Sequence, residues 1–292
     1  MRKAKSIFIL WYPLGVVVIA VLSLWMLVAG GHRLAWAGAL LTVLPFIGLY
    51  LRAVTSDTLA RTSHSLPVLS ALTLAGVALA AWAALSGAGG PWLPLALATA
   101  GAAGFFLYDF WYSSFGRRVS DRIVPGEPLP EFRATDLEGR PVGPGDLRGK
   151  PALYMFYRGN WCPFCQAQVR EIIDRYKELM DRGVEVALIS PDEHDLSRRV
   201  AEIFDAPFHF WIDRDLAAAR ALDIVDTQGV PAGPLRRRHG TDTVLPTVVI
   251  TDAGGRVIFS DQTRNYRVRP DPEIFLRVLS SHGVEGRTQP SS

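Results

Sequence analysis

The two halves of the chain differ in how hydrophobic and polar positions follow one another. In the first 116 residues, four runs carry almost no charge: Ile7–Gly30, Leu34–Leu51, Leu66–Ser86 and Pro91–Tyr112. Each is close to the ~20 residues that a helix needs to cross a hydrocarbon core about 30 Å thick. Trp and Tyr residues gather near the run ends, where membrane interfaces favour them. The pattern predicts an all-α transmembrane bundle of four helices within residues 1–116, at about 7–30, 34–51, 66–86 and 91–112.

From residue 117 onward, short apolar runs alternate with polar segments. A Pro-rich stretch at 125–130 predicts a juxtamembrane linker over 117–130. Hairpins are expected across 136–139 and 252–255. Buried strands are expected at 152–157, 184–189 and 208–212, and helices at 164–181, 196–204, 216–222 and 272–279. These elements predict an α/β domain over 131–281, a mixed sheet sandwiched by helices, followed by a flexible tail at 282–292.

Composition supports the membrane assignment and excludes other classes. Hydrophobic residues make up 49% of the chain and charged residues 20%, and the mean hydropathy is +0.17, which is unusual for a soluble enzyme. The apolar start is too long for the core of a cleaved signal peptide, so an uncleaved helix is expected. The basic excess lies at the edges of the apolar half, which argues against a nucleic-acid partner.

Basic residues also predict an orientation. Eight Lys and Arg residues lie in the N-terminal tail, the 52–66 segment and the segment after the fourth run, whereas the two opposite turns hold one. By the positive-inside rule, both termini and the polar half are cytoplasmic. The sequence therefore predicts an integral, multi-pass protein of the inner (plasma) membrane, with the lipid bilayer as a partner.

Both cysteines lie in one motif, Trp161-Cys162-Pro163-Phe164-Cys165, where a predicted strand runs into a predicted helix. A thiol at a helix N-terminus faces unpaired N–H groups and the positive end of the helix dipole, and both favour the thiolate. Pro163 suits the first helical position because it needs no N–H there. Three positions apart, the two cysteines can close a disulfide across one turn. The pattern predicts a dithiol site in which Cys162 attacks and Cys165 resolves, with no cofactor.

Further stretches carry a family resemblance, from about residue 124 to 279. They are Pro125-Gly-Glu-Pro-Leu-Pro-Glu-Phe, Asp136-Leu-Glu-Gly-Arg-Pro-Val, Leu147-Arg-Gly-Lys-Pro, Tyr157-Arg-Gly-Asn-Trp-Cys-Pro-Phe-Cys and Leu245-Pro-Thr-Val-Val-Ile. With them the chain resembles the redoxin, or AhpC/TSA, branch of the thioredoxin-like superfamily. The resemblance implies an antioxidant oxidoreductase with Cys162 as its nucleophile, a peroxide or disulfide substrate and a cellular thiol reductant. It also implies a cis bond before Pro246, packed against the two sulfurs.

The chain departs from the peroxiredoxin pattern at two positions. Gly159 and Met155 stand where that pattern has the Thr and the Pro that orient the peroxide, so any peroxidase activity is expected to be slow. The overall redoxin layout nevertheless favours a peroxide substrate. Trp161-Cys162-x-x-Cys165 also resembles thioredoxins and glutaredoxins, which leaves a protein disulfide reductase as the alternative. The buried acid of thioredoxins has no counterpart in 152–157.

Other residues are candidates with weaker support. Arg158 is a candidate to stabilise the thiolate, and Trp161 to cover the disulfide and dock partners. Arg264, Arg267 and Arg269 are candidates to line the site. Arg236–His239 lie in an insertion, 226–243, expected to be a solvated loop, with contact to anionic lipid as the alternative. Asp109, within the fourth run, is expected to reach headgroup water near the cytoplasmic end.

Three rival interpretations of the whole chain are weighed. A zinc site needs two more ligands, and the histidines show no ligand-like pairing, so no metal is expected. A transmembrane thiol relay needs cysteines in the membrane part, and residues 1–161 contain none. A redox sensor without turnover stays open as the non-enzymatic alternative.

Overall fold

The computed structural model describes residues 2–55, 63–86, 92–192, 198, 202 and 208–286. The chain divides into two compact units, which meet in sequence between Ser114 and Phe115. Each unit has its own secondary structure: helices alone in the first, and strands with helices in the second.

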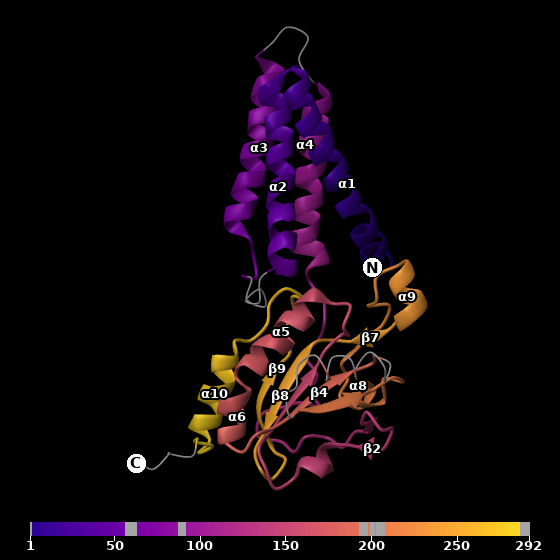
Figure 1. Ribbon diagram of the computed structural model, residues 1–292, viewed down its shortest axis with the longest axis vertical. Helices are drawn as coiled ribbons and strands as arrows, with labels where there is room; N and C mark the ends of the chain where they lie inside the picture. Colours follow the sequence, from indigo (N-terminus) through magenta and orange to yellow (C-terminus); the bar gives the residue numbers. More distant parts are fainter. Residues whose placement is uncertain are drawn as a thin grey trace. The chain divides into compact units, whose positions relative to one another are not determined.

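The first unit holds the predicted apolar helices, which run side by side in Figure 1. They are α1 (Arg2–Ala29), α2 (Arg33–Thr55), α3 (Pro67–Leu85) and α4 (Trp92–Phe106), which continues into a π-helix, η1 (Leu107–Tyr112). Four spans in these helices are long and apolar enough to cross a membrane: Lys3–Ala29, Arg33–Arg52, Pro67–Leu85 and Trp92–Tyr112. The sequence-based expectation of four such helices is confirmed.

Helices α2 and α3 approach each other through glycines. A Cβ atom on Gly76 would stand 2.7 Å from the carbonyl oxygen of Gly38, and one on Gly38 would stand 2.6 Å from the backbone nitrogen of Ala80. Small residues of this kind let apolar helices pack closely without a hydrophobic driving force between them.

Asp109 has a structural partner. It is buried, and its Oδ2 accepts a hydrogen bond from the backbone N–H of Leu66 at 3.4 Å. Leu66 is the residue before α3, so the carboxylate satisfies one of the N–H groups that a helix start leaves unpaired. The expectation that Asp109 reaches headgroup water is replaced by a capping contact.

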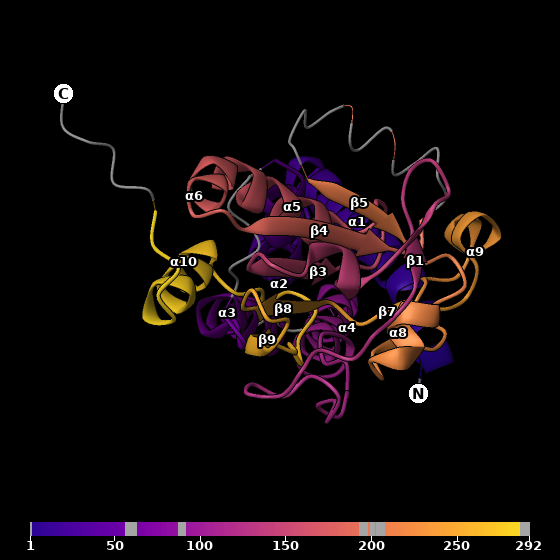
Figure 2. The ribbon, with the colours of Figure 1, turned by 90° about the horizontal axis from the view of Figure 1, so that it is seen from below.

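The second unit is built on a seven-stranded sheet with the order β2-β1-β5-β4-β3-β8-β9. The strands are β1 (Ala134–Thr135), β2 (Pro141–Val142), β3 (Ala152–Phe156), β4 (Glu185–Ser190), β5 (His209–Ile212), β8 (Thr247–Thr251) and β9 (Val257–Asp261). Strands β3, β4 and β5 are parallel, whereas β8 runs antiparallel to β3, and β9 runs antiparallel to β8. Figure 2 shows β5, β4, β3, β8 and β9 following one another across the sheet. A mixed sheet was expected, and this is one.

Helices cover both faces of the sheet. They are α5 (Pro163–Asp174), α6 (Tyr176–Asp181), α8 (Ala217–Ala221) and α10 (Pro272–Ser281), with a short 3-10 helix at Pro144–Leu147. Figure 1 shows α5, α6 and α10 on one side of the strands and α8 on the other. Alternate residues of β3 divide accordingly, because Ala152, Tyr154 and Phe156 join the core cluster that contains Ala218 and Ala219 of α8. The central strand is thus buried on both faces, as its apolar run predicts.

The segment 117–130 is not a free linker. Ile123 is 1% exposed and Leu129 5% exposed, and both belong to the core cluster under α8. The Ser120 hydroxyl donates to the carbonyl oxygen of Leu222. The prolines favoured the prediction of an exposed linker. Instead, the apolar residues of the segment are buried in the core of the domain.

Two further expectations change. The helix expected over 164–181 is two helices, because α5 ends before Arg175 and α6 begins after it. The insertion 226–243 is not a plain loop: β6 (Val225–Asp226) pairs with β7 (Thr243–Val244) at its base, and α9 (Pro234–His239) lies within it. Most of the helix expected over 196–204 lies outside the described residues, as do residues 287–292 of the tail expected over 282–292. Helix α10 ends at Ser281, just before that tail.

Candidate active site

Cys162 stands at the start of α5, where the chain leaves the central strand. It is the N-cap residue of α5 with an extended backbone (φ −96°, ψ 109°), and Pro163 follows as the first helical residue. The N–H groups of Cys165 and Gln166 donate to the Cys162 carbonyl oxygen at 3.0 and 3.1 Å. The strand, turn and helix therefore place this thiol as the motif predicts.

The two sulfur atoms are buried and not joined in a disulfide. Cys162 is 2% exposed and Cys165 is not exposed. A hydrogen bond from the Cys165 thiol, together with the charges of Arg158 and Arg269, lowers the pKa of Cys162 to about 6 against the opposing effect of burial. Burial raises the pKa of Cys165 well above its ordinary value, and donating to Cys162 raises it more. One thiolate and one thiol follow from this arrangement.

Arg158 lies in the turn between β3 and the cysteines. Its guanidinium stacks over the Trp161 ring at 4.9 Å from the ring centroid, and its Nη2 lies 3.6 Å from the Asp226 carboxylate with both side chains buried. It also donates to the carbonyl oxygen of Gly229. An arginine at a strand end commonly lies exposed at the surface. Arg158 is buried instead, because the insertion 226–243 covers its side chain.

Arg269 is a second buried guanidinium near the sulfurs. Its charge lowers the pKa of both cysteines. Nη1 donates to the carbonyl oxygen of Val268 at 2.8 Å, while Nε and Nη2 have no hydrogen-bond partner among the described residues. The site therefore holds donors that stay available for an anionic group.

Arg117, from the segment that was expected to be a linker, reaches the start of β8. Nη1 donates to the carbonyl oxygen of Pro246 at 2.9 Å, and Nη2 to the hydroxyl of Thr247 at 3.2 Å. Burial lowers the pKa of Arg117 to about 10, with the nearby Asp261 acting in the opposite direction. Burial also raises the pKa of Asp261.

The expectation of a cis bond before Pro246 is wrong. Among the described residues no peptide bond is cis. For an X–Pro bond the trans form is the lower by about 0.5–1 kcal/mol unless the surroundings require the cis form. Here the Leu245 N–H donates to the Ile224 carbonyl oxygen at 2.7 Å and the Pro246 carbonyl accepts from Arg117, so hydrogen bonds on both sides of the bond form along a trans backbone.

Asp192 and His239 form a pair that the sequence did not indicate. The Asp192 Oδ1 lies 3.1 Å from the His239 Nδ1, and its Oδ2 accepts from the backbone N–H of Asn160 at 2.5 Å. Burial raises the pKa of Asp192, and the Asn160 N–H and His239 oppose that rise. Asp192 follows β4, and His239 was assigned to a solvated run of basic residues. Only the tertiary structure brings them to the turn that precedes Cys162.

Of the three arginines expected to line the site, Arg267 is fully buried and Arg269 nearly so. Arg269 acts on the pKa of both cysteines, whereas Arg264 is not among the groups that do. Within the described ranges, no three His, Cys, Asp or Glu side chains gather as metal ligands do.

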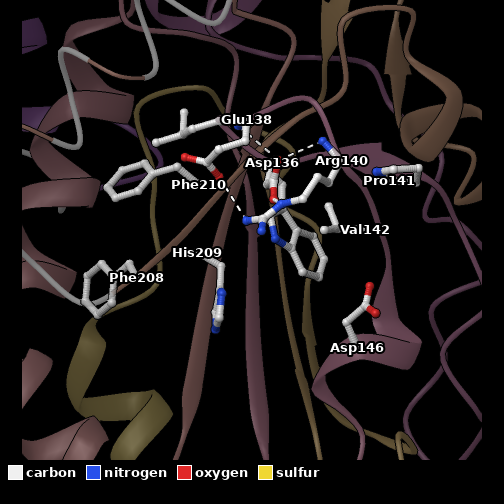
Figure 3. A pocket seen from close by; sticks show the side chains of 11 residues that line it. Asp136, Glu138, Arg140, Pro141, Val142, Asp146, Phe208, His209 and Phe210 are labelled. Atoms are coloured by element: carbon white, nitrogen blue, oxygen red, sulfur yellow. Dashed lines mark hydrogen bonds and ion pairs between the residues drawn. The ribbon is translucent and has the colours of Figure 1, made fainter.

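A separate hollow lies at the far edge of the sheet. It measures about 440 Å³ and is lined by the β1–β2 hairpin and by β5, including Asp136, Arg140 and His209. Figure 3 shows Arg140 paired with Asp136 and Glu138 among the residues that line it. Neither cysteine lines this hollow, so it is not part of the dithiol site.

The comparisons with known proteins concern the polar half. The AhpC/TSA family model matches residues 125–260. The thiol-disulfide oxidoreductase ResA of Bacillus cereus is 28% identical over 185 residues, which cover 63% of this chain and 92% of that protein. Chloroplastic peroxiredoxin Q of Sedum lineare is 32% identical over 92 residues, which cover 32% of this chain and 50% of that protein.

One solved structure is similar at lower identity. The peroxidoxin BcpB from Mycobacterium tuberculosis is 18% identical, with a TM-score of 0.45 over 55% of this chain and 97% of that chain.

The mixed sheet, the Cys-x-x-Cys helix start and the matching family model agree on one classification. Residues 125–260 match the AhpC/TSA family model, which supports the redoxin branch of the thioredoxin-like superfamily, and they follow four helices that are apolar enough to span a membrane.

Proposed function

We propose that this protein is a membrane-embedded dithiol oxidoreductase that takes electrons from a cellular thiol reductant and passes them to a disulfide or a hydroperoxide. The observation that carries the proposal is the asymmetry of the two sulfurs. Cys162 has a pKa lowered to about 6, and the Cys165 thiol that donates to it has a raised pKa. A thiolate is the nucleophile in thiol–disulfide exchange, and a protonated neighbour is held ready as the resolving group.

With a disulfide substrate, the Cys162 thiolate attacks one substrate sulfur. A mixed disulfide forms and the other substrate sulfur leaves as a thiolate. Cys165 then loses its proton and attacks the Cys162 sulfur, which releases the second substrate thiolate and leaves a Cys162–Cys165 disulfide. A cellular thiol reductant returns two electrons and two protons to the pair.

With a hydroperoxide, the thiolate attacks the terminal peroxide oxygen. The O–O bond breaks, an alcohol or water leaves, and Cys162 becomes a sulfenic acid that Cys165 condenses with, releasing water. Thr and Pro are absent at the two positions where peroxiredoxins orient the peroxide. Met155 lies inside β3, paired with Leu188 and Val248 on its two sides, where a proline cannot donate to the ladder. The free Nε and Nη2 of Arg269 are the donors that support peroxide reduction without those residues.

The membrane part of the proposal concerns orientation. Eight basic residues flank one side of the four spans and one flanks the other, which supports an inner-membrane protein with both termini and the dithiol domain on the cytoplasmic side. In that compartment thiols are kept reduced, so the pair acts as an electron donor to its substrates.

Turnover of the full chain in detergent tests the proposal. The purified protein is supplied with a dithiol reductant and, in parallel, with hydrogen peroxide, an alkyl hydroperoxide and a protein disulfide. Cys162→Ser is expected to abolish consumption of the reductant, and Cys165→Ser to trap a mixed disulfide or a sulfenic acid on Cys162. A single oxidation event without continuous consumption would instead identify a redox sensor.

A further inference from the structure

The insertion between β6 and β7 is held together by hydrogen bonds between its own residues. The ladder of β6 and β7 closes its base, and the Val230 N–H donates to the Thr241 carbonyl oxygen at 3.1 Å. From α9, the Arg236 Nε donates to the Val230 carbonyl oxygen at 2.9 Å. These bonds lie inside the insertion, so α9 and the segment before it can move together about the ladder.

At its base, the insertion is tied to the turn that leads to Cys162. Asp226 pairs with the Arg158 guanidinium at 3.6 Å, and the Thr243 hydroxyl donates to the Arg158 carbonyl oxygen at 2.7 Å. Both contacts are made by residues of the ladder itself, so they hold the hinge end of the insertion.

At its far end, the insertion is tied to the same turn through one carboxylate. Asp192 receives the Asn160 N–H on Oδ2 at 2.5 Å and the His239 Nδ1 on Oδ1 at 3.1 Å. Because a carboxylate only accepts hydrogen bonds, the Nδ1 atom carries the proton. The His239 ring also lies 6.4 Å from the Trp161 ring, centroid to centroid. Asp192 thus joins the tip of α9 to the residues immediately before Cys162.

The contact is desolvated. The side chain of His239 is 9% exposed and that of Asp192 is 1% exposed, so the hydrogen bond competes little with water. The cysteines beside it are 2% and 0% exposed. A bulky substrate therefore reaches Cys162 only when a segment beside the site moves, and the insertion, which contacts the turn before Cys162, can move about its own ladder.

We propose that His239 is a specificity-determining positioning residue: its bond to Asp192 latches the 226–243 insertion onto the turn before Cys162 and limits access to substrates of small-molecule size until the latch opens. The role as a substrate gate rests on the proposed function of Cys162. With the latch closed, a hydroperoxide or a small disulfide is favoured, and a protein disulfide reacts only from the open state.

Alkylation of the reduced full chain in detergent tests the latch without requiring turnover. Cys162 is labelled with iodoacetamide and, separately, with a maleimide carrying a polyethylene glycol chain, and His239→Ala is compared with the parent. The variant is expected to react about tenfold faster with the bulky reagent. A hydrogen bond to a charged group shifts the equilibrium between the open and closed insertion toward the closed state by roughly that factor or more. The rate with iodoacetamide changes by less than about twofold, and the pH midpoint of alkylation stays in place.

Two controls separate a latch from general loosening. His239→Asn keeps a donor near the position of Nδ1 and restores the slow reaction with the bulky reagent. Arg237→Ala removes an exposed charge from the same helix and behaves as the parent. An unchanged bulky-reagent rate in His239→Ala, or an equal rise for both reagents, would overturn the proposal. The proposed function is tested separately. It fails if the protein shows no turnover even though the alkylation rates of His239→Ala change as the latch predicts.

Discussion

Gly159 lies directly against Asp192: a Cβ atom on residue 159 would stand 2.6 Å from the Asp192 Oδ1. The glycine also has a φ of +131°, which other residues rarely adopt. The same carboxylate holds Asn160 and His239. Residue 159 is the position where peroxiredoxins have threonine. Here the Asp192 carboxylate fills the space that a threonine side chain would need.

Gly159→Thr is accordingly expected to lower stability without raising the rate with peroxide. The unfavourable φ costs on the order of 1–3 kcal/mol, and displacement of Asp192 adds to it. Gly149→Thr is the matched control, because Gly149 has a φ of +92° but nothing within 4 Å of its Cβ position. Thermal unfolding and stopped-flow oxidation measure both effects. Equal stability of the two variants, or a faster peroxide reaction of Gly159→Thr, would contradict the packing argument.

The reactivity of Cys162 is expected to follow a midpoint near pH 6, because its pKa is lowered to about 6. Alkylation rises as the pH increases through that value and then levels off, while Cys165 stays unmodified because its pKa is raised. Mass spectrometry of each cysteine after timed labelling gives the profile. Preferential labelling of Cys165 would reverse the assignment of the two roles.

The same pKa shift makes the stability of the reduced protein depend on pH. An unfolded thiol has a pKa of about 8.5, above the folded value for Cys162, so the stabilising contribution is present above that unfolded value. It is lost as the pH falls through about 6. The thermal midpoint of the reduced protein is expected to decrease over this range relative to that of the disulfide form. If the thermal midpoints of the two forms change with pH in parallel, the Cys162 thiolate does not contribute to stability as expected.

Arg158→Met is expected to raise the pKa of Cys162 and to destabilise the domain. The Asp226 carboxylate loses its buried guanidinium partner, and breaking such a pair typically costs about 3–5 kcal/mol. Adding Asp226→Asn removes the buried negative charge and restores much of the stability, but leaves the pKa of Cys162 raised. Denaturation together with the alkylation profile distinguishes the two effects. A double variant that also recovered the low pKa would show that Arg158 does not act on the thiolate by its charge.

The orientation of the membrane part is tested with reporter fusions at the C-terminus. The eight-to-one asymmetry of flanking basic residues predicts that a reporter active only in the cytoplasm is active and one that needs the periplasm is silent. Fusions after residue 31 are expected to give the opposite result. A periplasmic C-terminal signal would place the dithiol pair in an oxidising compartment.

Much of the fold could be predicted because its signals are local. The apolar run 152–157 becomes β3 (Ala152–Phe156), and the hairpin expected across 252–255 is formed by β8 and β9. Length and uncharged composition likewise define the apolar helices. The Cys-x-x-Cys helix start is recognisable because Pro163 and the preceding strand lie beside it in the sequence.

What could not be predicted depends on contacts between distant residues. Arg117 looks like a flank of the fourth apolar run, yet it donates to the carbonyl oxygen of Pro246, 129 positions away. Asp192 and His239 are 47 positions apart, and no periodicity relates them. Long-range polar contacts of single residues leave no pattern that a sequence can show.

The hydrogen-bonded thiolate of Cys162 has a consequence for the direction of electron flow. Disulfide formation removes the negative charge that now faces Arg158 and Arg269, so these groups stabilise the reduced pair more than the oxidised pair. Stabilising the dithiol form raises the reduction potential of the couple. Its disulfide is then easier to reduce, and its dithiol is a weaker reductant, than in a pair without these charges. The driving force thus ranks hydroperoxides and strained disulfides ahead of stable structural disulfides.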